Sequence, residues 1–254
     1  AIVDAEGKID TLKSGTVTIT ATAEKTEKYE QASSSYTLTI HKADQNITFE
    51  KIKEDELEVT FNDNNNIFIN IANSDKGVTE CAYHMISGPA TVKDENSGEI
   101  EINGAGTIVV GVDFVETDCY NSANNTYTLY VKKDSQEIAF ENASYTVTSG
   151  ENMDTPNMAA PVGEFYGTSA ITYSIVSDSN QIIEQLDTAT GKVTLSYQTG
   201  TATIRATKAE DANYLEAKVS SKGNIVFFFD KFHSLGKNNS INTATQKNVM
   251  KILL

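Results

Sequence analysis

The stretch GTIVVGVDFVETDCY runs from Gly106 to Tyr120 and opens with a Gly–Thr turn signal. Apolar residues then alternate with others along it, and a period of two is typical of a strand with one buried face. Nearly the same phrase occurs as GTVTITATAEKTEKY from Gly15 to Tyr29 and as GTATIRATKAEDANY from Gly200 to Tyr214. Three copies of one strand-and-turn unit predict a repeated β domain.

The three copies keep one register over most of their length. Gly15 and Gly106 are 91 residues apart, and Gly106 and Gly200 are 94 apart. Further pairs or triplets recur at spacings of 91 to 94: Gly7, Gly98 and Gly191; Tyr29, Tyr120 and Tyr214; Tyr36 and Tyr127; Gln45 and Gln136; Phe49 and Phe140. So many anchors in one register indicate internal duplication.

A period near 90 residues suits a whole small domain, because solenoid repeats are only 20 to 50 residues long. In the middle copy, short turn-bounded strands are expected near residues 57–61, 67–71, 80–86, 99–102, 107–112 and 127–131. The strand that follows the glycine is expected to bury every second side chain. Its inward residues are Val17, Ile19 and Ala21 in one copy, Ile108, Val110 and Val112 in the next, and Ala202, Ile204 and Ala206 in the last. Two antiparallel sheets packed on such faces form a β-sandwich.

The motif SGTVTITATAEKTEKYEQASSSYTLTIHKADQNITF resembles the bacterial Ig-like repeats of large surface and secreted proteins. The resemblance covers residues 1 to about 220 and implies an all-β chain of tandem immunoglobulin-like β-sandwich domains. Members of that family form stalks, spacers and adhesive arms, and some bind carbohydrate or host receptors. The resemblance carries over no catalytic residues.

Four segments are expected along the chain. Residues 1–43 form the C-terminal half of a first copy, residues 44–133 a complete second copy and residues 134–221 a third. The third copy has Ser221 where the pattern calls for Tyr, so its last strand is expected out of register at 225–229. Residues 222–254 form a divergent tail with five Lys and one Asp. A sorting signal and a misread frame are alternatives for its origin.

Two sets of residues are assigned structural roles. Gly15, Gly106 and Gly200 start the repeated strand. Tyr29, Tyr120 and Tyr214 resemble a tyrosine corner, in which the hydroxyl bonds to backbone. A stacking platform for sugar rings is the functional alternative for these tyrosines.

Composition narrows the classes of function. The net charge of −15 argues against a nucleic-acid partner, because binding a phosphate backbone rests on clustered Lys and Arg. No stretch approaches the roughly 20 apolar residues of a membrane span. His41, His84 and His233 are scattered, and no nucleophile motif accompanies them, so no catalytic residue and no enzyme activity are predicted.

No cofactor and no metal are predicted either. The acidic loops at 113–118 and 208–213 raise the alternative of a calcium site, but lysines interleave with the carboxylates, which favours solvated loops. Asn62–Asn66 is expected to be a turn, because Asn tolerates left-handed backbone. The sequence allows two interpretations of the cysteines: a disulfide between Cys81 and Cys119, or burial of Cys81 as a small apolar residue.

The sequence thus predicts a non-enzymatic, extracellular or cell-surface segment that spaces or presents a binding function. The alternative is a module that itself binds glycan or a host protein, or one accessory to a secreted glycoside hydrolase. The only partners expected within the chain are the neighbouring Ig-like copies.

Overall fold

The structure, a computed structural model, describes residues 1–51, 57–148 and 157–226. These residues form strands and two short 3-10 helices, η1 (Asp63–Asn66) and η2 (Ser179–Gln181). The chain divides into two compact units. Unit 1 contains Ala1–Ile138, Pro161–Ala170 and Lys208–Ala217, and unit 2 contains Ala139–Ala160, Ile171–Thr207 and the described residues from Lys218 on.

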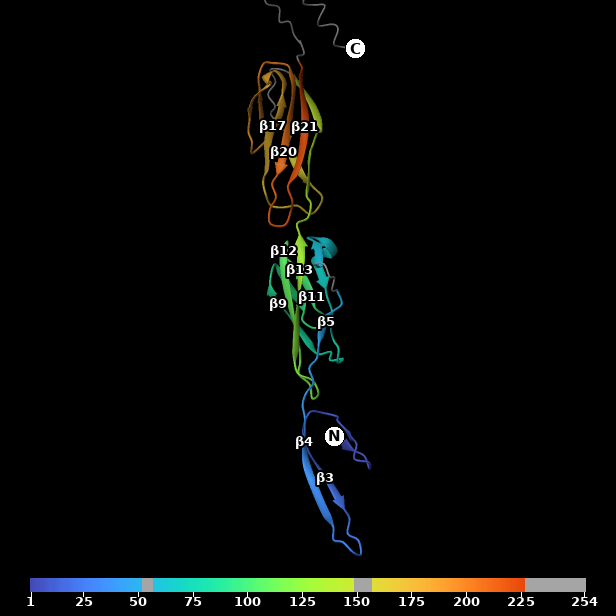
Figure 1. Ribbon diagram of the computed structural model, residues 1–254. Helices are drawn as coiled ribbons and strands as arrows, with labels where there is room; N and C mark the ends of the chain where they lie inside the picture. The colour runs from blue at the N-terminus through green and yellow to red at the C-terminus, as the bar shows by residue number, and fades with distance from the viewer. Residues whose placement is uncertain (52–56, 149–156, 227–254) are drawn as a thin grey trace, which may run out of the picture. The chain divides into compact units, whose positions relative to one another are not determined.

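The first copy is a long hairpin. Strand β3 (Gly15–Ala23) pairs antiparallel with β4 (Ala32–Ile40), from Gly15 opposite Ile40 to Ala23 opposite Ala32 (Figure 1). A small ribbon of β1 (Ile2–Val3) and β2 (Ile9–Asp10) precedes it. Val17 and Ile19 alternate with exposed threonines as expected, but both remain half-exposed because a two-stranded hairpin has no second sheet of its own. Ala21, expected on the same inward face, is exposed.

The second copy is a two-layered sandwich. One layer has the strand order β6-β13-β12-β9, and the other is formed by β10-β11-β7 together with the pair β5-β8. β6 and β13, which are the first and last strands of this layer along the chain, are neighbours in it and pair in parallel, with Leu57 opposite Leu129. This is the strand arrangement of an immunoglobulin-type sandwich. The strands are β5 (Ile47–Phe49), β6 (Leu57–Thr60), β7 (Ile67–Ile69), β8 (Ala72–Ser74), β9 (Cys81–Ser87), β10 (Ala90–Asp94), β11 (Glu99–Ile102), β12 (Gly106–Phe114) and β13 (Ala123–Lys132).

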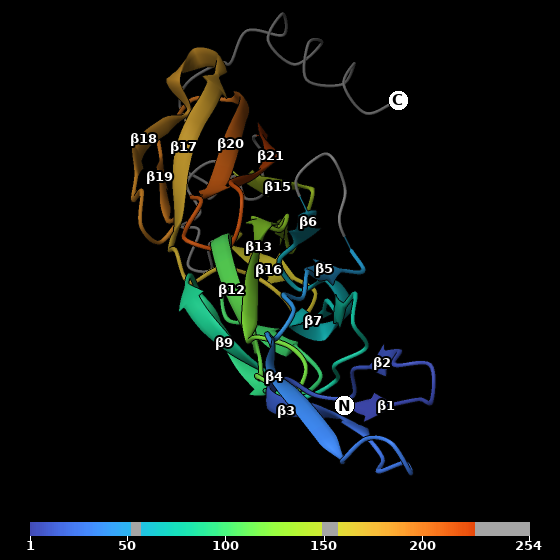
Figure 2. The same ribbon diagram turned by 60° about the horizontal axis from the view of Figure 1, so that its bottom comes forward.

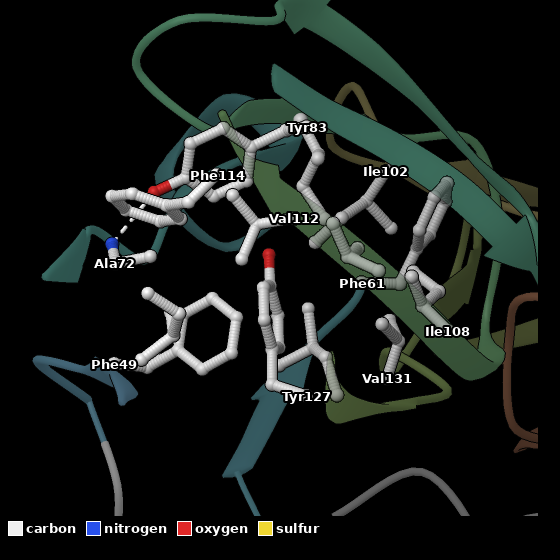
Figure 3. Close-up of a cluster of buried hydrophobic side chains, with 14 of the residues drawn as sticks. Phe49, Phe61, Ala72, Tyr83, Ile102, Ile108, Val112, Phe114, Tyr127 and Val131 are labelled. Atoms are coloured by element: carbon white, nitrogen blue, oxygen red, sulfur yellow. Dashed lines mark hydrogen bonds between the residues drawn. The ribbon is translucent and has the colours of Figure 1, made fainter. Parts of the chain in front are cut away.

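Its core lies between the two layers (Figure 3). Ile108, Val110 and Val112 are completely buried, so the alternation expected from the sequence is confirmed. Phe49 meets the ring of Tyr127 edge-on, with ring centroids 4.9 Å apart. The hydroxyl of Tyr127 is buried and has no hydrogen-bond partner among the residues that the structure describes. This burial raises the pKa of Tyr127.

The third copy repeats the four-stranded layer with the order β15-β21-β20-β17, in which β15 and β21 again pair in parallel (Figure 2). The short pairs β14-β16 and β18-β19 complete it. The strands are β14 (Glu137–Phe140), β15 (Ser144–Thr148), β16 (Ala159–Val162), β17 (Ile171–Asp178), β18 (Ile183–Leu186), β19 (Val193–Leu195), β20 (Gly200–Lys208) and β21 (Ala217–Val226).

The expectation of an out-of-register last strand at 225–229 is corrected. Strand β21 begins at Ala217 and ends at Val226, and both bounds lie 94 residues after those of β13. Residues 227–229 lie outside the described residues. Pairing with β15 and β20 keeps the strand in register although Tyr is replaced. The buried Ser221 hydroxyl lies 3.0 and 3.1 Å from the carbonyl oxygens of Asn142 and Ala143 and accepts a hydrogen bond from Asn157, so it is satisfied in place of the ring.

The six strands expected in the second copy are confirmed by β6, β7, β9, β11, β12 and β13. The sequence did not reveal β5, β8 and β10, which are only three to five residues long. An all-β fold of tandem immunoglobulin-like sandwiches is therefore established for this chain.

Candidate functional site

A buried glutamine ties each complete copy together near its first residues. The side-chain amide of Gln45 donates to the carbonyl oxygens of Val115 and Asn121. Gln136, 91 residues later, donates to those of Ala209 and Leu215, each 94 residues after its counterpart. Both amides join the start of the copy to the loop before its last strand. Recurrence of the same bonds at the repeat spacing identifies a structural device of the fold.

A second device is a tyrosine that bonds to backbone. The Tyr83 hydroxyl accepts a hydrogen bond from the Ala72 amide at 2.6 Å, drawn as a dashed line in Figure 3. The Tyr173 hydroxyl accepts from the Ala159 amide at 3.0 Å. Both amides are buried, so the hydroxyl supplies a partner that water cannot. Burial raises the pKa of Tyr83 above its usual value.

Each of these rings lies against a glycine that follows a turn. Gly98 and Gly191 both have φ of +71°, and a Cβ at Gly98 would lie 2.6 Å from the Tyr83 ring. The turns start at Asp94 and Asp187, whose carboxylates accept hydrogen bonds from the backbone amides of the residues two positions on. These backbone hydrogen bonds lower the pKa of both aspartates.

The predicted strand-starting glycines are found where they were expected. Gly15, Gly106 and Gly200 are the first residues of β3, β12 and β20. Gly15 and Gly106 have φ of +129° and +138°, a conformation that favours glycine. At Gly200 an added Cβ would lie 2.6 Å from the Ser179 carbonyl oxygen. Close approach, rather than positive φ, is the constraint there.

The three predicted tyrosines follow β3, β12 and β20 and share one backbone turn. In each turn, the carbonyl oxygen of the tyrosine accepts a hydrogen bond from the backbone amide three residues earlier. The donors to Tyr29, Tyr120 and Tyr214 are Thr26, Thr117 and Asp211. Their side chains differ, since Tyr29 is 75% exposed and Tyr214 is buried.

The structure gives the Tyr214 hydroxyl a different partner from the backbone group of a tyrosine corner. Within unit 1, the side-chain amide of Asn62 donates to this hydroxyl at 2.9 Å and to Asp134 at 3.0 Å. Asn62 has φ of +70°, as the interpretation of 62–66 as a left-handed turn requires. The backbone role assigned to this tyrosine by sequence is played by Tyr83 and Tyr173. These two lie 90 residues apart, outside the spacing of 91 to 94 that marks the other anchors, so the repeat did not reveal them.

Residues that could act as nucleophiles, acids, bases or metal ligands are dispersed. Cys81 and Cys119 are free thiols, and burial raises the pKa of Cys81. His84 lies 3.3 Å from Asp113, and both side chains are about half-exposed. In the part of the chain that the structure describes, no three His, Cys, Asp or Glu side chains gather to hold a metal ion. Among the same residues, no helix has the length and apolarity needed to cross a membrane.

One exposed segment of the third copy is longer than its counterpart in the second. In the second copy, Tyr83 lies 11 residues after Ala72, the alanine that it bonds. In the third copy, Tyr173 lies 14 residues after Ala159, so the segment between them is three residues longer. The longer segment contains the exposed Phe165 and Tyr166. It is a candidate binding surface of the described chain.

Comparison with known proteins gives likeness of fold only. No protein-family model matches the sequence, and no curated protein matches it. Among solved structures, human CDH23 EC21-23 is similar with a TM-score of 0.33 and 13% identity, over 75% of this chain and 68% of that one. Mouse protocadherin-24 EC1-3 gives a TM-score of 0.35 and 11% identity, over 84% of this chain and 80% of that one. Protocadherin gammaB7 EC3-6 gives 0.35 and 16%, over 89% of this chain and 60% of that one.

Proposed function

We propose that this chain is a non-enzymatic extracellular segment of tandem Ig-like modules that spaces or presents a binding function, in the manner of bacterial surface adhesins. The copies are proposed to be residues 1–43, 44–133 and 134–221, followed by the divergent tail. On this proposal, the glycine and tyrosine positions are structural and serve the modules themselves.

The shortness of the connecting segments carries the proposal. After β4 ends at Ile40, the chain is already bonded into the second copy at Ala43, whose amide and carbonyl bond to Cys119 and Asn121. After β13 ends at Lys132, Asp134 is held in the same way by Asn213 and Leu215. Only one or two residues lie between a last strand and the next anchored residue, which is far too few for a flexible coil.

Charge pairs recur beside these anchors. Lys42 pairs with Glu116, and Lys133 pairs with Glu210 at 3.3 Å. In each pair the carboxylate is exposed and the lysine is half-buried, and a pair of this kind near the surface is worth at most about 1 kcal/mol. Their recurrence supports a junction that is copied with the module rather than a chance linker.

Single-molecule pulling tests the proposal. Anchored by its ends, the chain should unfold in two separate force peaks, one for the second copy and one for the third. Each of these copies has close to 90 residues, so each peak should release roughly 30 nm of contour length. A single cooperative peak for the whole chain would contradict an array of independent modules.

A further inference from the structure

One face of the β3–β4 hairpin is apolar and lies open. Val17 is opposite Leu38 and Ile19 is opposite Tyr36, so these four side chains share one face of the pair. Tyr36 is 55% exposed, and the other three are half-exposed. In the second copy, the residues 91 positions later are at most 7% exposed: Ile108, Val110, Tyr127 and Leu129. The hairpin therefore exposes a surface that the fold buries where its module is complete.

A groove of about 220 Å³ lies on the hairpin, with Leu12, Val17 and Ile40 as its apolar walls. In the second copy, the residues at the positions of Val17 and Ile40 belong to one buried cluster with Phe61 (Figure 3). The Phe61 amide donates to the carbonyl oxygen of Lys132 at 2.9 Å, which holds this residue against the end of β13. The repeat therefore indicates that an aromatic side chain belongs over the groove of the hairpin.

Both edges of the hairpin are open among the residues that the structure describes, since β3 and β4 form a two-stranded sheet. The counterparts of β4 each pair in parallel with a further strand, β13 with β6 and β21 with β15. The counterparts of β3 are also bordered, β12 by the antiparallel β9 and β20 by β17. Two internal templates thus agree on the strands that the hairpin would receive, one on each edge.

The part that the first copy does not contain is defined by the same comparison. Strands β1 and β2 lie 91 residues before parts of β10 and β11, so those two strands have counterparts. The counterparts of β5 to β9, which are residues 47–87 of the second copy, are not among residues 1–43. A second molecule of this chain does not supply them without loss, because its own residues 47–87 cover its own β12 and β13.

We propose that the open face of the hairpin docks the N-terminal half of a further Ig-like module of the array, a segment with the strands and apolar pattern of residues 47–87. A strand of the pattern Leu-x-Val-x-Phe, as at Leu57–Phe61, lies parallel to β4. Its Phe amide donates to the carbonyl oxygen of His41, the counterpart of Lys132, and its ring enters the groove. This inference rests on the proposed tandem-module function and names the partner of its first copy.

The identity of the receiving residues carries the choice of partner. Tyr36 and Leu38 are the same residues as their counterparts Tyr127 and Leu129. At the other two positions of the face, Val and Ile are exchanged, a difference of one methylene group. A face that is nearly unchanged accepts the apolar side chains that its counterpart accepts. Addition of strands to open edges provides backbone hydrogen bonds, and the apolar face provides specificity.

An NMR titration of the labelled full chain tests the proposal. The probe is an unlabelled polypeptide with the sequence of residues 44–89, added under reducing conditions. We expect it to shift the amides of β3 and β4 saturably and to slow their hydrogen exchange. The amides of β12 and β13 should stay unchanged, because β6 and β9 already occupy those edges.

Matched variants locate the contact. A probe that carries Phe61→Ala should bind the parent chain at least about tenfold more weakly, because it removes the aromatic anchor. In the chain, Leu38→Lys should abolish binding, whereas Thr37→Lys should bind as the parent does. Thr37 is the control because it neighbours Leu38 in β4 and is exposed on the other face. If Leu38→Lys does not fold, the Phe61→Ala probe still tests the proposal on the unchanged chain.

The proposal is overturned if the probe leaves β3 and β4 unchanged, or if the Phe61→Ala probe binds equally well. It is also overturned if sedimentation shows that the chain alone dimerises and that Leu38→Lys abolishes the dimer, since a second molecule would then cover the face. The two force peaks of the spacer proposal come from the second and third copies and do not depend on this contact. Failure of one proposal is therefore distinguishable from failure of the other.

Discussion

Replacing Tyr83 by Phe should destabilise the second copy, whereas replacing Tyr127 by Phe in the same core should not. Both rings are buried in one cluster, and each change removes a single oxygen atom (Figure 3). The Tyr83 hydroxyl is the acceptor for the buried Ala72 amide, while the Tyr127 hydroxyl has no partner in the described chain. The two variants therefore separate the hydrogen bond from the packing of the ring.

The magnitude follows from the fate of the amide. With Phe at position 83, the Ala72 N–H stays buried without a partner, which costs about 1–3 kcal/mol. With Phe at position 127, an unpaired polar atom is removed from an apolar site, so the free energy of unfolding should stay the same or rise by up to about 1 kcal/mol.

Native-state hydrogen exchange of the full chain measures both effects locally. Amides of β12 exchange through opening of the second copy, and amides of β20 provide an internal reference in the third. A loss of 1–3 kcal/mol should speed exchange in β12 by roughly 5- to 150-fold for Tyr83→Phe, with β20 unchanged. Equal acceleration by both variants, or none by Tyr83→Phe, would refute the claim that this hydroxyl stabilises the sandwich by pairing a buried amide.

Three further outcomes are expected. Gly98→Ala should destabilise its copy by more than the roughly 1–2 kcal/mol that a left-handed backbone costs, because the new Cβ meets the Tyr83 ring. Gly7→Ala should cost only that backbone amount, because its Cβ meets nothing within 4 Å. Urea denaturation compares the two variants. Ser221→Ala should lower the stability of the third copy by about 1 kcal/mol in the same assay, since the side-chain amide of Asn157 loses one of its two acceptors. Because the folded-state pKa values of Asp94 and Asp187 lie below the unfolded value, their contribution is present above about pH 4 and is lost as pH falls further. The midpoint of urea unfolding should therefore be flat from pH 7 to 5 and drop below pH 4, with a shallower drop in Asp187→Asn.

The repeat spacing near 90 residues and the alternation of apolar side chains along the strands were enough to predict the sandwich. Glycines at positive φ and alternating apolar residues leave a local signal, so β12 and its inward face could be read directly from Gly106 onward. The last strand of the third copy was misplaced because Ser221 breaks the side-chain pattern, although pairing with β20 still fixes the register of the backbone. A buried polar side chain with three partners can replace a buried ring, and residue identity alone does not show those partners.

The side-chain contacts were harder to predict than the fold. Hydrogen bonds of Tyr83 depend on which amide faces its hydroxyl in space, and the sequence singled out Tyr214 instead. The longer segment of the third copy is visible only after the copies are aligned through their contacts, since Tyr83 lies 11 residues after Ala72 and Tyr173 lies 14 after Ala159. Exposure of Phe165 is likewise a property of the folded chain.

Small-angle X-ray scattering of the chain in solution tests the central claim, an array of modules joined by short anchored connections, most directly. A strand of ten residues spans about 34 Å, so three modules in line would extend about 100 Å and give a radius of gyration near 30 Å. A single compact domain of this length would give about 18 Å. The account predicts a value close to the first, and a value close to the second would contradict it.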